Sequence, residues 1–249
     1  MSMIHAENVS KHYGTLEAVS GISIQVPEGS IFGLVGSDGA GKTTILRMIA
    51  TMIRPSSGHI HVGGFDVVSH RTRAKELMGY MPQRFGLYPD LTVQENLDFF
   101  LDIYEIVGPE RERRRKKYLG FSNLIPFASR RAGDLSGGMK QKLGLACVLV
   151  HQPKVLILDE PTNGVDPVSR REFWDILSEM KKGGMTILVS TSYLDEGEKC
   201  DRLALLHRSK MLGEATPDDM RATYSSLEQA MIARIQEVDE TLVHDDFGM

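Results

Sequence analysis

The stretch IFGLVGSDGAGKTTILRMI (31–49) decides the fold. It begins with a continuous apolar run, which is typical of a strand buried on both faces of a parallel sheet. A glycine-rich loop follows, and then a helical pattern that extends over 42–53. Residues 36–43, GSDGAGKT, fit G-x-x-x-x-G-K-[ST], and the flanking strand and helix are the context that this pattern needs. The stretch therefore predicts a strand, a phosphate-binding loop and a helix.

The chemistry of this loop suits the phosphates of a nucleotide. Glycines let backbone N–H groups turn inward around the β- and γ-phosphates, and the helix N-terminus adds a favourable dipole. Lys42 brings a positive charge to those phosphates, and Thr43 can ligate Mg²⁺. The alternative, an ordinary glycine-rich turn with a chance lysine, does not account for the flanking strand and helix.

A second apolar run, VLILDE (155–160), ends in two carboxylates. Asp159, at the end of the expected strand, can hold Mg²⁺ directly or through a water. Glu160 can polarise a water for in-line attack on a γ-phosphate. Alone, such a pair could be a helix cap. Together with the phosphate loop it implies a nucleoside triphosphatase, without indicating which one.

The remaining patterns place both motifs in one parallel sheet. Strands are predicted at 22–26, 154–159, 185–190 and 202–207, and helices within 91–150, at 167–183 and at 226–238. Buried strands that alternate with helices favour an α/β fold. The helical stretch 91–150 is then an insert in the sheet domain and not an independent domain. In the last helix, Leu227, Ala230, Met231 and Ile235 share one face.

The composition of the 249-residue chain narrows the classes of function. Its formal net charge is -4, and a nucleic-acid binder would show a basic excess, so no nucleic-acid partner is expected. Cys147 and Cys200 have no C-x-x-C spacing, so a disulfide framework is not expected. The sequence has no membrane-spanning apolar run of roughly 20 residues and no signal pattern. We expect a cytosolic chain that reaches a membrane only through a partner.

The basic run RERRRKK (111–117) could suggest a phosphate site. Two pairs, Glu110 with Arg114 and Glu112 with Lys116, are spaced as i,i+4 ion pairs, so a solvated helix face is the better interpretation. Contact with anionic lipid or a partner loop is the alternative.

A third motif, LSGGMKQKL (135–143), opens a helix shortly before VLILDEPTNGVDP (155–167). Taken alone, Ser136 could be an ordinary N-cap. In this combination the chain resembles the ATP-binding cassette family, the nucleotide-binding subunits of ABC transporters, over nearly its whole length. The resemblance implies an α/β P-loop NTPase (RecA-like) core with an antiparallel β edge and an inserted helical subdomain. The implied divisions are 1–90 and 150–222 for the core with its β edge, 91–149 for the helical subdomain with the signature motif, and 223–249 for a C-terminal helical extension.

The resemblance also implies roles for individual residues. Tyr13 in KHYG would stack on adenine, and Gln83 in YMPQ would contact Mg²⁺ and the attacking water and sense a membrane subunit. Asp166 in GVDP matches a loop that crosses a dimer interface. The implied ATP-binding residues are Tyr13, Gly36, Ser37, Asp38, Gly39, Ala40, Gly41, Lys42, Thr43 and Thr44. The implied metal-binding residues are Thr43, Gln83 and Asp159, and the implied catalytic positions are Glu160, Gln83 and Ser192. The implied signature residues, which would contact the ATP of a partner, are Leu135, Ser136, Gly137, Gly138 and Met139.

The mechanism implied by the resemblance uses two cassettes that meet head to tail. Each ATP, with its Mg²⁺, lies between the phosphate loop of one cassette and the signature helix of the other. ATP therefore holds the dimer together, and hydrolysis lets the halves part. The second cassette is an identical chain, an unlike chain or the other half of a longer one.

A membrane-spanning subunit is the other implied partner, and it would hold the cassette at the cytoplasmic face of the membrane. We expect it to dock between Gln83 and Asn96, where four apolar side chains gather: Phe85, Leu87, Tyr88 and Leu91. The stretches PQRFGLYPDLTVQENL (82–97) and SLEQAMIARI (226–235) look most like cassettes of bacterial drug, polysaccharide or sodium exporters, especially the first half of tandem-cassette exporter ATPases. GLACVLV, DPVSRREFW and STSYLDE are further matching phrases.

Two departures from the family pattern matter. Ser37 and Asp38 stand where the family usually has Pro and Asn. In STSYLDE (190–196), Ser192 stands where the family has a histidine that touches the γ-phosphate, so this contact is expected to be weaker. The alternative is a harmless replacement, with Glu160 sufficient alone. Three functions therefore stay open: the ATPase of an exporter, a soluble ABC ATPase of translation, DNA repair or cofactor assembly, and a regulatory dimer that ATP holds with little turnover.

Overall fold

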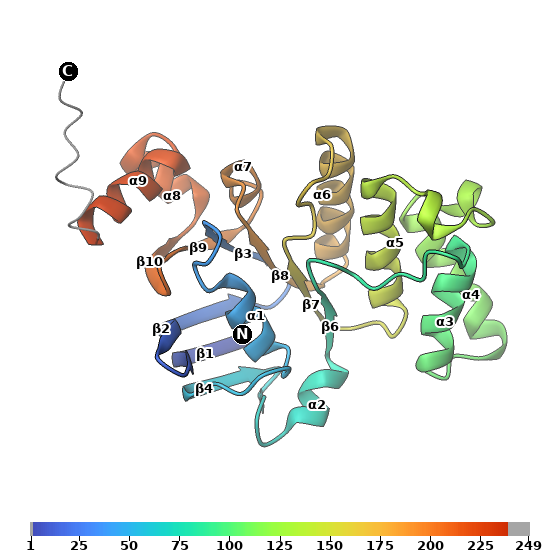
Figure 1. Cartoon of the computed structure of the whole chain (residues 1–249), viewed down its shortest axis with the longest axis horizontal. Helices are drawn as coiled ribbons and strands as arrows, with labels where there is room; N and C mark the ends of the chain where they lie inside the picture. The colour runs from blue at the N-terminus through green and yellow to red at the C-terminus, as the bar shows by residue number, and fades with distance from the viewer. Residues whose placement is uncertain (1, 239–249) are drawn as a thin grey trace.

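The computed structural model describes residues 2–238, and within them the strands form two sheets (Figure 1). In spatial order the larger sheet contains β10 (Lys210–Ala215), β9 (Arg202–His207), β3 (Ile31–Gly36), β8 (Thr186–Thr191), β7 (Val155–Asp159) and β6 (Met78–Met81). Strands β9, β3, β8, β7 and β6 run parallel, and β10 pairs antiparallel with β9 at the edge. The three buried strands predicted at 154–159, 185–190 and 202–207 are confirmed as neighbours or near neighbours of β3.

Helices cover both faces of the larger sheet, which explains why its central strands are apolar throughout. Ile157 and Leu188 join the buried cluster that contains α1 (Lys42–Ile49). Their chain neighbours Leu156, Leu158 and Val189 join the cluster that contains α5 (Gly137–Leu149) and α6 (Pro167–Lys182). Because successive side chains of a strand point to opposite faces, a strand covered on both faces shows no polar alternation.

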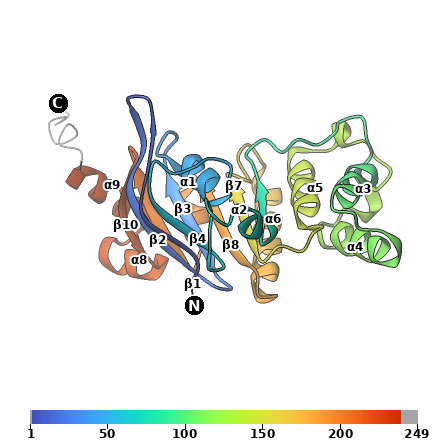
Figure 2. The same ribbon diagram turned by 90° about the horizontal axis from the view of Figure 1, so that it is seen from below.

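The smaller sheet is antiparallel and packs against the other side of α1. In spatial order it contains β2 (Leu16–Pro27), β1 (Ser2–Tyr13), β4 (Ser57–Val62) and β5 (Phe65–Asp66). The alternating pattern at 22–26 is confirmed, because Ile22, Ile24 and Val26 are buried and the residues between them are exposed. The short helix α2 (Arg71–Glu76) links this sheet to β6. Figure 2 shows the smaller sheet well apart from the inserted helices.

The helix after the phosphate loop is shorter than its sequence pattern predicts. It ends at Ile49, and Thr51 adopts a left-handed φ of 61°. The backbone N–H groups of Met52 and Ile53 both turn back to the carbonyl of Arg47. The prediction of a helix to residue 53 was therefore wrong by one turn, since the apolar spacing continues beyond the point where the backbone leaves the helix.

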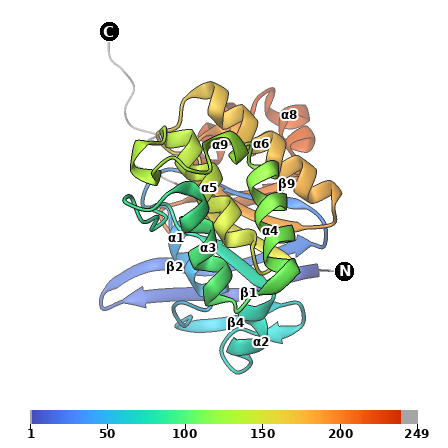
Figure 3. The same cartoon turned by 90° about the vertical axis from the view of Figure 1, so that its right-hand side faces the viewer.

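The helical insert contains α3 (Val93–Ile103), α4 (Gly108–Phe121) and α5, with short 3-10 turns at Ile125–Phe127 and Ala132–Asp134. It lies at one end of the molecule and faces the viewer in Figure 3. The helix α3 begins with a reciprocal cap, in which Thr92 and Glu95 each accept a backbone N–H of the other. Leu97, Leu101 and Leu143 pack its interior. The mixed α/β fold with an antiparallel edge and a helical insert is thus present, while the exact division at residues 90 and 150 stays a proposal.

The basic run on α4 is only partly a solvated face. Arg111 and Arg115 both pair with Asp98 on α3. Arg114 donates a 2.7 Å hydrogen bond to the carbonyl of Val150 at the end of α5, besides its predicted pair with Glu110. The predicted Glu110–Arg114 pair is confirmed, but the expected solvated face was wrong for these three arginines, because periodicity alone could not show that α3 and α5 lie beside them.

The C-terminal elements form a third buried cluster against β9 and β10. They are α7 (Leu194–Gly197), α8 (Pro217–Tyr224) and α9 (Leu227–Val238). On α9 the predicted face is confirmed: Leu227 and Ala230 are buried, and Met231 and Ile235 pack against the same cluster. Residues 239–249 of the predicted C-terminal extension lie outside the described residues.

Cys147 and Cys200 are both buried and free, which confirms that they form no disulfide with each other. Among residues 2–238, no helix combines the length and the hydropathy that crossing a membrane requires.

Candidate functional site

The candidate site lies where the central parallel strands end, which is where open α/β sheets bind ligands. The loop after β3 and the carboxylate of Glu160, directly after β7, meet in a cleft of about 460 Å³. The cleft is lined by Tyr13, Leu16, Ala18, Asp38, Gly39, Ala40, Gly41, Lys42, Thr43, Thr44, Gln83, Glu160 and Ser209. The structure therefore brings together most of the predicted nucleotide-binding residues with two of the predicted catalytic ones.

The phosphate loop needs glycine at its last turn. Gly41 is the N-cap of α1 and has a φ of 99°, a left-handed conformation that other residues rarely adopt. A Cβ atom at this position would lie 2.5 Å from the carbonyl oxygen of Ala18 on β2. Gly41 thus lets α1 begin directly beneath the loop. An α-helix N-terminus leaves backbone N–H groups free, so this end of α1 presents donors and a favourable dipole to an anion.

Lys42 is held inside the loop by oxygen atoms alone. Its Nζ atom donates to the carbonyls of Gly36 at 2.7 Å and Ser37 at 3.0 Å. It also forms an ion pair of 2.9 Å with Oε1 of Glu160. Both side chains are almost fully buried, at 3% and 7% exposure. The loop and the catalytic candidate are therefore in direct contact.

Three hydroxyl groups surround the carboxylate of Asp159. Thr43 and Ser190 each donate to its Oδ1 atom at 2.9 Å, and Tyr80 donates to its Oδ2 atom at 3.3 Å. Burial, followed by the negative charge of Asp159, raises the pKa of Tyr80 to about 12. The phenol therefore stays protonated at neutral pH and acts as a donor. Asp159 is fixed in place from three different elements.

Glu160 adopts an unusual backbone conformation just after β7. Its φ is 46°, and its N–H donates to both the side-chain oxygen of Ser190 at 3.0 Å and the carbonyl of Ser190 at 3.2 Å. Its Oε2 atom accepts from the amides of Gln83 at 3.3 Å and Asn163 at 3.1 Å. These contacts aim the carboxylate at the cleft, beside the amide of Gln83.

The oxygen atoms of Thr43 and Asp159 fit a magnesium ion. Mg²⁺ prefers hard oxygen ligands and usually takes one or two protein groups, with waters and substrate phosphates completing its shell. The Thr43 hydroxyl and the Asp159 carboxylate are such groups, lie 2.9 Å apart and adjoin the phosphate loop. Gln83 makes no hydrogen bond to Thr43 or Asp159 within the described residues, but its amide donates to the carboxylate of Glu160, the residue that follows Asp159.

Tyr13, the last residue of β1, also lines the cleft. Its side chain is half exposed, and the ammonium of Lys11 lies 5.2 Å from the centre of its ring. An exposed aromatic face beside a phosphate loop suits a stacked base. Its role in binding adenine stays a prediction.

The signature residues 135–139 do not line this cleft. Ser136 is the N-cap of α5 and accepts the N–H of Met139 at 3.3 Å. Gly138 packs against α6 so closely that a Cβ atom would lie 2.3 Å from that of Ser169. Asp166 caps α6 by accepting the N–H of Ser169 at 2.9 Å. The predicted signature and the predicted dimer loop are therefore neighbours, on a surface apart from the phosphate loop of the same chain.

The predicted weak point, Ser192, is exposed just beyond β8 and is not among the residues that line the cleft. The buried hydroxyl at the site belongs instead to Ser190, two residues earlier. Sequence reasoning missed Ser190, Tyr80 and Asn163. The three consecutive hydroxyl residues 190–192 indicated a polar site at the end of this strand. Only the pairing of β8 with β7, which places Ser190 opposite Asp159, shows which of the three hydroxyl groups contacts the carboxylate.

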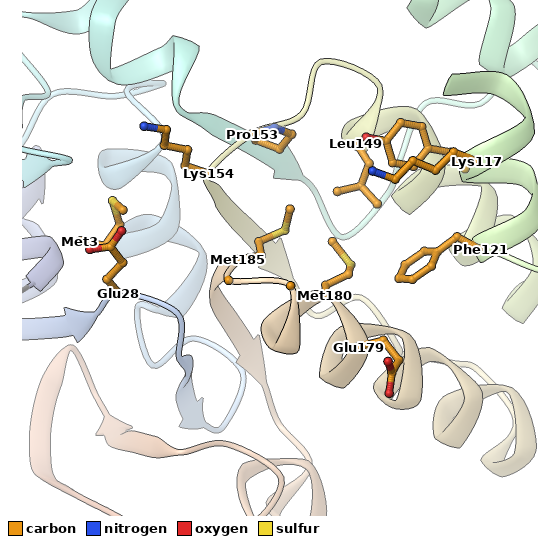
Figure 4. Close-up of a pocket in the computed structure, with 13 residues that line it drawn as sticks. Met3, Glu28, Lys117, Phe121, Leu149, Pro153, Lys154, Glu179, Met180 and Met185 are labelled. Carbon is orange, nitrogen blue, oxygen red and sulfur yellow. The ribbon is translucent and has the colours of Figure 1, made fainter. Parts of the chain in front are cut away.

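A second hollow, of about 520 Å³, lies at the other end of the same strands (Figure 4). Met185 and Pro153 precede β8 and β7, and Phe121 reaches the hollow from α4. Thioether and aromatic groups dominate its centre, while Lys117 and Glu179 stand at its rim. It lacks the convergent hydroxyl and carboxylate groups of the phosphate-loop cleft, so we place the chemistry at the latter.

Comparison with known proteins agrees with this geometry. Residues 19–163 match the profile of the ABC transporter family. The chain is 49% identical over 206 residues to the probable multidrug ABC transporter ATP-binding protein YbhF of Escherichia coli K12; the match covers 83% of this chain and 36% of YbhF. It is 34% identical to the linearmycin resistance ATP-binding protein LnrL of Bacillus subtilis 168, over 98% of this chain and 83% of LnrL. This chain thus spans about a third of the length of YbhF.

Solved structures show the same fold. An ATP-binding subunit of an ABC transporter superposes with a TM-score of 0.82 at 28% identity, over 94% of this chain and 99% of that one. A dimeric bacterial ABC transporter cassette superposes with a TM-score of 0.77 at 26% identity, over 86% of this chain and 98% of that one.

Proposed function

The chain belongs to the ABC transporter family of ATP-binding proteins, and from this premise we propose that it is the ATP-hydrolysing subunit of an exporter. One observation carries the proposal. Lys42, Thr43 and Glu160 line one cleft, and Asp159, which would hold a metal ion together with Thr43, lies buried 2.9 Å from the Thr43 hydroxyl. Two relatives with matching sequences are named as multidrug transport and linearmycin resistance proteins, which favours export.

The proposed mechanism begins with the ion pair between Lys42 and Glu160. The phosphates of ATP would accept hydrogen bonds from the N–H groups at the start of α1 and from the ammonium of Lys42. Thr43 and Asp159 would hold Mg²⁺, which would neutralise part of the negative charge of the phosphates. Glu160 would then hold a water for in-line attack, with Gln83 beside it. Tyr13 would stack on the adenine.

A second cassette would complete each site. The exposed residues Ser136 and Gly137 stand at the N-terminus of α5, which presents free N–H groups and a favourable dipole. Because this end does not line the cleft of its own chain, we propose that it faces the γ-phosphate bound by a partner cassette. Asp166 would lie at the same interface. The partner is a second copy or an unlike cassette.

A membrane-spanning subunit is the other proposed partner, and it would hold the chain at the cytoplasmic face of the membrane. A shallow hollow of about 370 Å³ lies beside the cleft and is lined in part by Gln83, Phe85, Leu87 and Pro89. Tyr88 is 44% exposed next to it. Gln83 joins this hollow to Glu160, so a subunit seated here would sense the catalytic centre directly.

The alternative is an ATP-gated dimer that turns over slowly; it rests on Ser192 alone, and the exporter relatives do not favour it. Ser192 is short and exposed where the family has a histidine. Steady-state release of phosphate from Mg-ATP by the purified chain distinguishes the two functions. Sustained release that requires Lys42 supports an ATPase, whereas tight ATP binding with only trace release supports the gated dimer.

A further inference from the structure

One buried hydroxyl contacts both Asp159 and Glu160. Ser190 on β8 is fully buried, and its Oγ atom donates to Oδ1 of Asp159 at 2.9 Å. The same atom accepts the backbone N–H of Glu160 at 3.0 Å. No other contact within residues 2–238 is seen to join the side chain of Asp159 to the backbone of Glu160 in this way.

The register of the sheet explains why a serine can make both contacts. Strand β8 lies between β3 and β7, and Ser190 is paired with Leu34 on one side and with Asp159 on the other. A hydroxyl buried at the centre of a sheet needs partners, because an unsatisfied one costs free energy. A serine can donate one hydrogen bond and accept others, and here it does both. An apolar residue would be expected at a buried strand position that served packing alone.

We propose that Ser190 is a positioning residue that sets the two carboxylates of the site relative to each other. It orients Asp159 toward the hydroxyl of Thr43, which shares the same Oδ1 atom. It also anchors the N–H of Glu160, whose φ of 46° is a conformation that non-glycine residues adopt rarely. The inference rests on the proposed function, since it assigns Asp159 to the metal and Glu160 to the water.

The two contacts predict separate consequences. Without the hydroxyl, Asp159 keeps the donors Thr43 and Tyr80 but loses the one that comes from β8. Partners that orient a metal ligand typically change metal affinity or activity by roughly 10–100-fold when they are removed. Glu160 would keep only the longer bond to the carbonyl of Ser190, at 3.2 Å. Both the affinity for Mg²⁺ and the rate of hydrolysis should therefore fall, while the contacts between the phosphate loop and the phosphates remain.

The experiment compares Ser190→Ala with the parent in two measurements. The first titrates Mg²⁺ into protein with a fluorescent ATP analogue and records the Mg²⁺ concentration that gives half of the metal-dependent binding. We expect this concentration to rise roughly 10–100-fold, with binding in EDTA unchanged. The second measures steady-state hydrolysis at saturating Mg²⁺, where kcat should fall about 10–100-fold and KM for ATP should stay close to that of the parent.

Thr186→Val is the matched control. Thr186 is a second fully buried hydroxyl on β8, at the opposite end of the strand, and it accepts the N–H of Gly29 at 2.9 Å. Loss of this hydroxyl should lower the thermal midpoint of unfolding. The Mg²⁺ concentration for half of the metal-dependent binding, kcat and KM for ATP should all stay close to those of the parent. If Ser190→Ala does not fold, Ser190→Cys keeps a side chain of similar shape with a weak donor, and it should shift the Mg²⁺ titration in the same direction.

The outcomes separate this inference from the proposed function. A parent that shows no Mg²⁺-dependent nucleotide binding would overturn the proposed function itself. A parent that binds Mg-ATP, together with a folded Ser190→Ala or Ser190→Cys protein whose Mg²⁺ titration and kcat equal those of the parent, would overturn only the role of Ser190. Equal effects of Thr186→Val and Ser190→Ala would also count against it, because they would show a general loss of stability.

Discussion

The ammonium of Lys42 lies 2.9 Å from the carboxylate of Glu160, and solvent reaches almost nothing of either side chain. The phosphate loop and the carboxylate that follows β7 therefore neutralise each other in this structure. A buried pair of this kind gains little stability by itself, but removal of one partner leaves the other charge buried alone. ATP phosphates can replace Glu160 as the partner of Lys42, which would leave the carboxylate to act on a water.

Lys42→Ala should therefore have two effects. Nucleotide binding should be lost or severely weakened, because the loop loses its positive charge. The free energy of unfolding of the nucleotide-free protein should fall by about 3 kcal/mol, since Glu160 then lacks its cation. Fluorescent nucleotide titration and denaturant unfolding measure the two effects. Lys154→Ala, which removes an exposed lysine beside the second hollow, is the control and should change neither. Parent-like ATP binding by Lys42→Ala would contradict the assignment of the loop.

Charged substitutions at Leu87 and Tyr88 should release the chain from membranes that contain its partner and should spare ATP binding. Leu87 lines the hollow next to Gln83, and Tyr88 is half exposed beside it. Co-sedimentation with membranes measures the effect. Val107→Glu is the matched control, because Val107 is 73% exposed before α4 and does not line that hollow. Intact membrane association of the double variant would refute the proposed docking surface.

Ser192→His should speed hydrolysis if the serine weakens the site. A missing preorganised contact to the transition state typically costs a factor of about 10²–10³ in rate. The measurement is turnover per site at saturating Mg-ATP for parent, Ser192→His and Ser192→Ala proteins. Ser192→Ala should have the same turnover as the parent, because the exposed hydroxyl of Ser192 makes no contact in the cleft that the substitution would remove. If the parent is already fast and the histidine does not raise its turnover, the proposed weakening of the site by Ser192 is wrong.

Local sequence patterns were sufficient for the parts of the site that depend on one element. The loop at 36–43 is recognisable because strand, glycines, lysine and helix follow each other directly, and Asp159 stands out as a charge at the end of an apolar strand. Ser190 was not recognisable, because its partners lie on a neighbouring strand whose register the sequence does not reveal. The role of Arg114 was missed for a similar reason, since Val150 reaches it only through packing of α4 on α5.

The most direct test of the account is phosphate release from Mg-ATP by the parent and by Glu160→Gln. The amide keeps the shape of Glu160 and can still accept from Gln83, but it cannot act as a base. We predict sustained release by the parent, a rate lower by about 10²–10⁴-fold in the variant, and retained ATP binding that holds the variant as a dimer on gel filtration. Equal release by the two proteins would contradict the claim that this cleft hydrolyses ATP through Glu160.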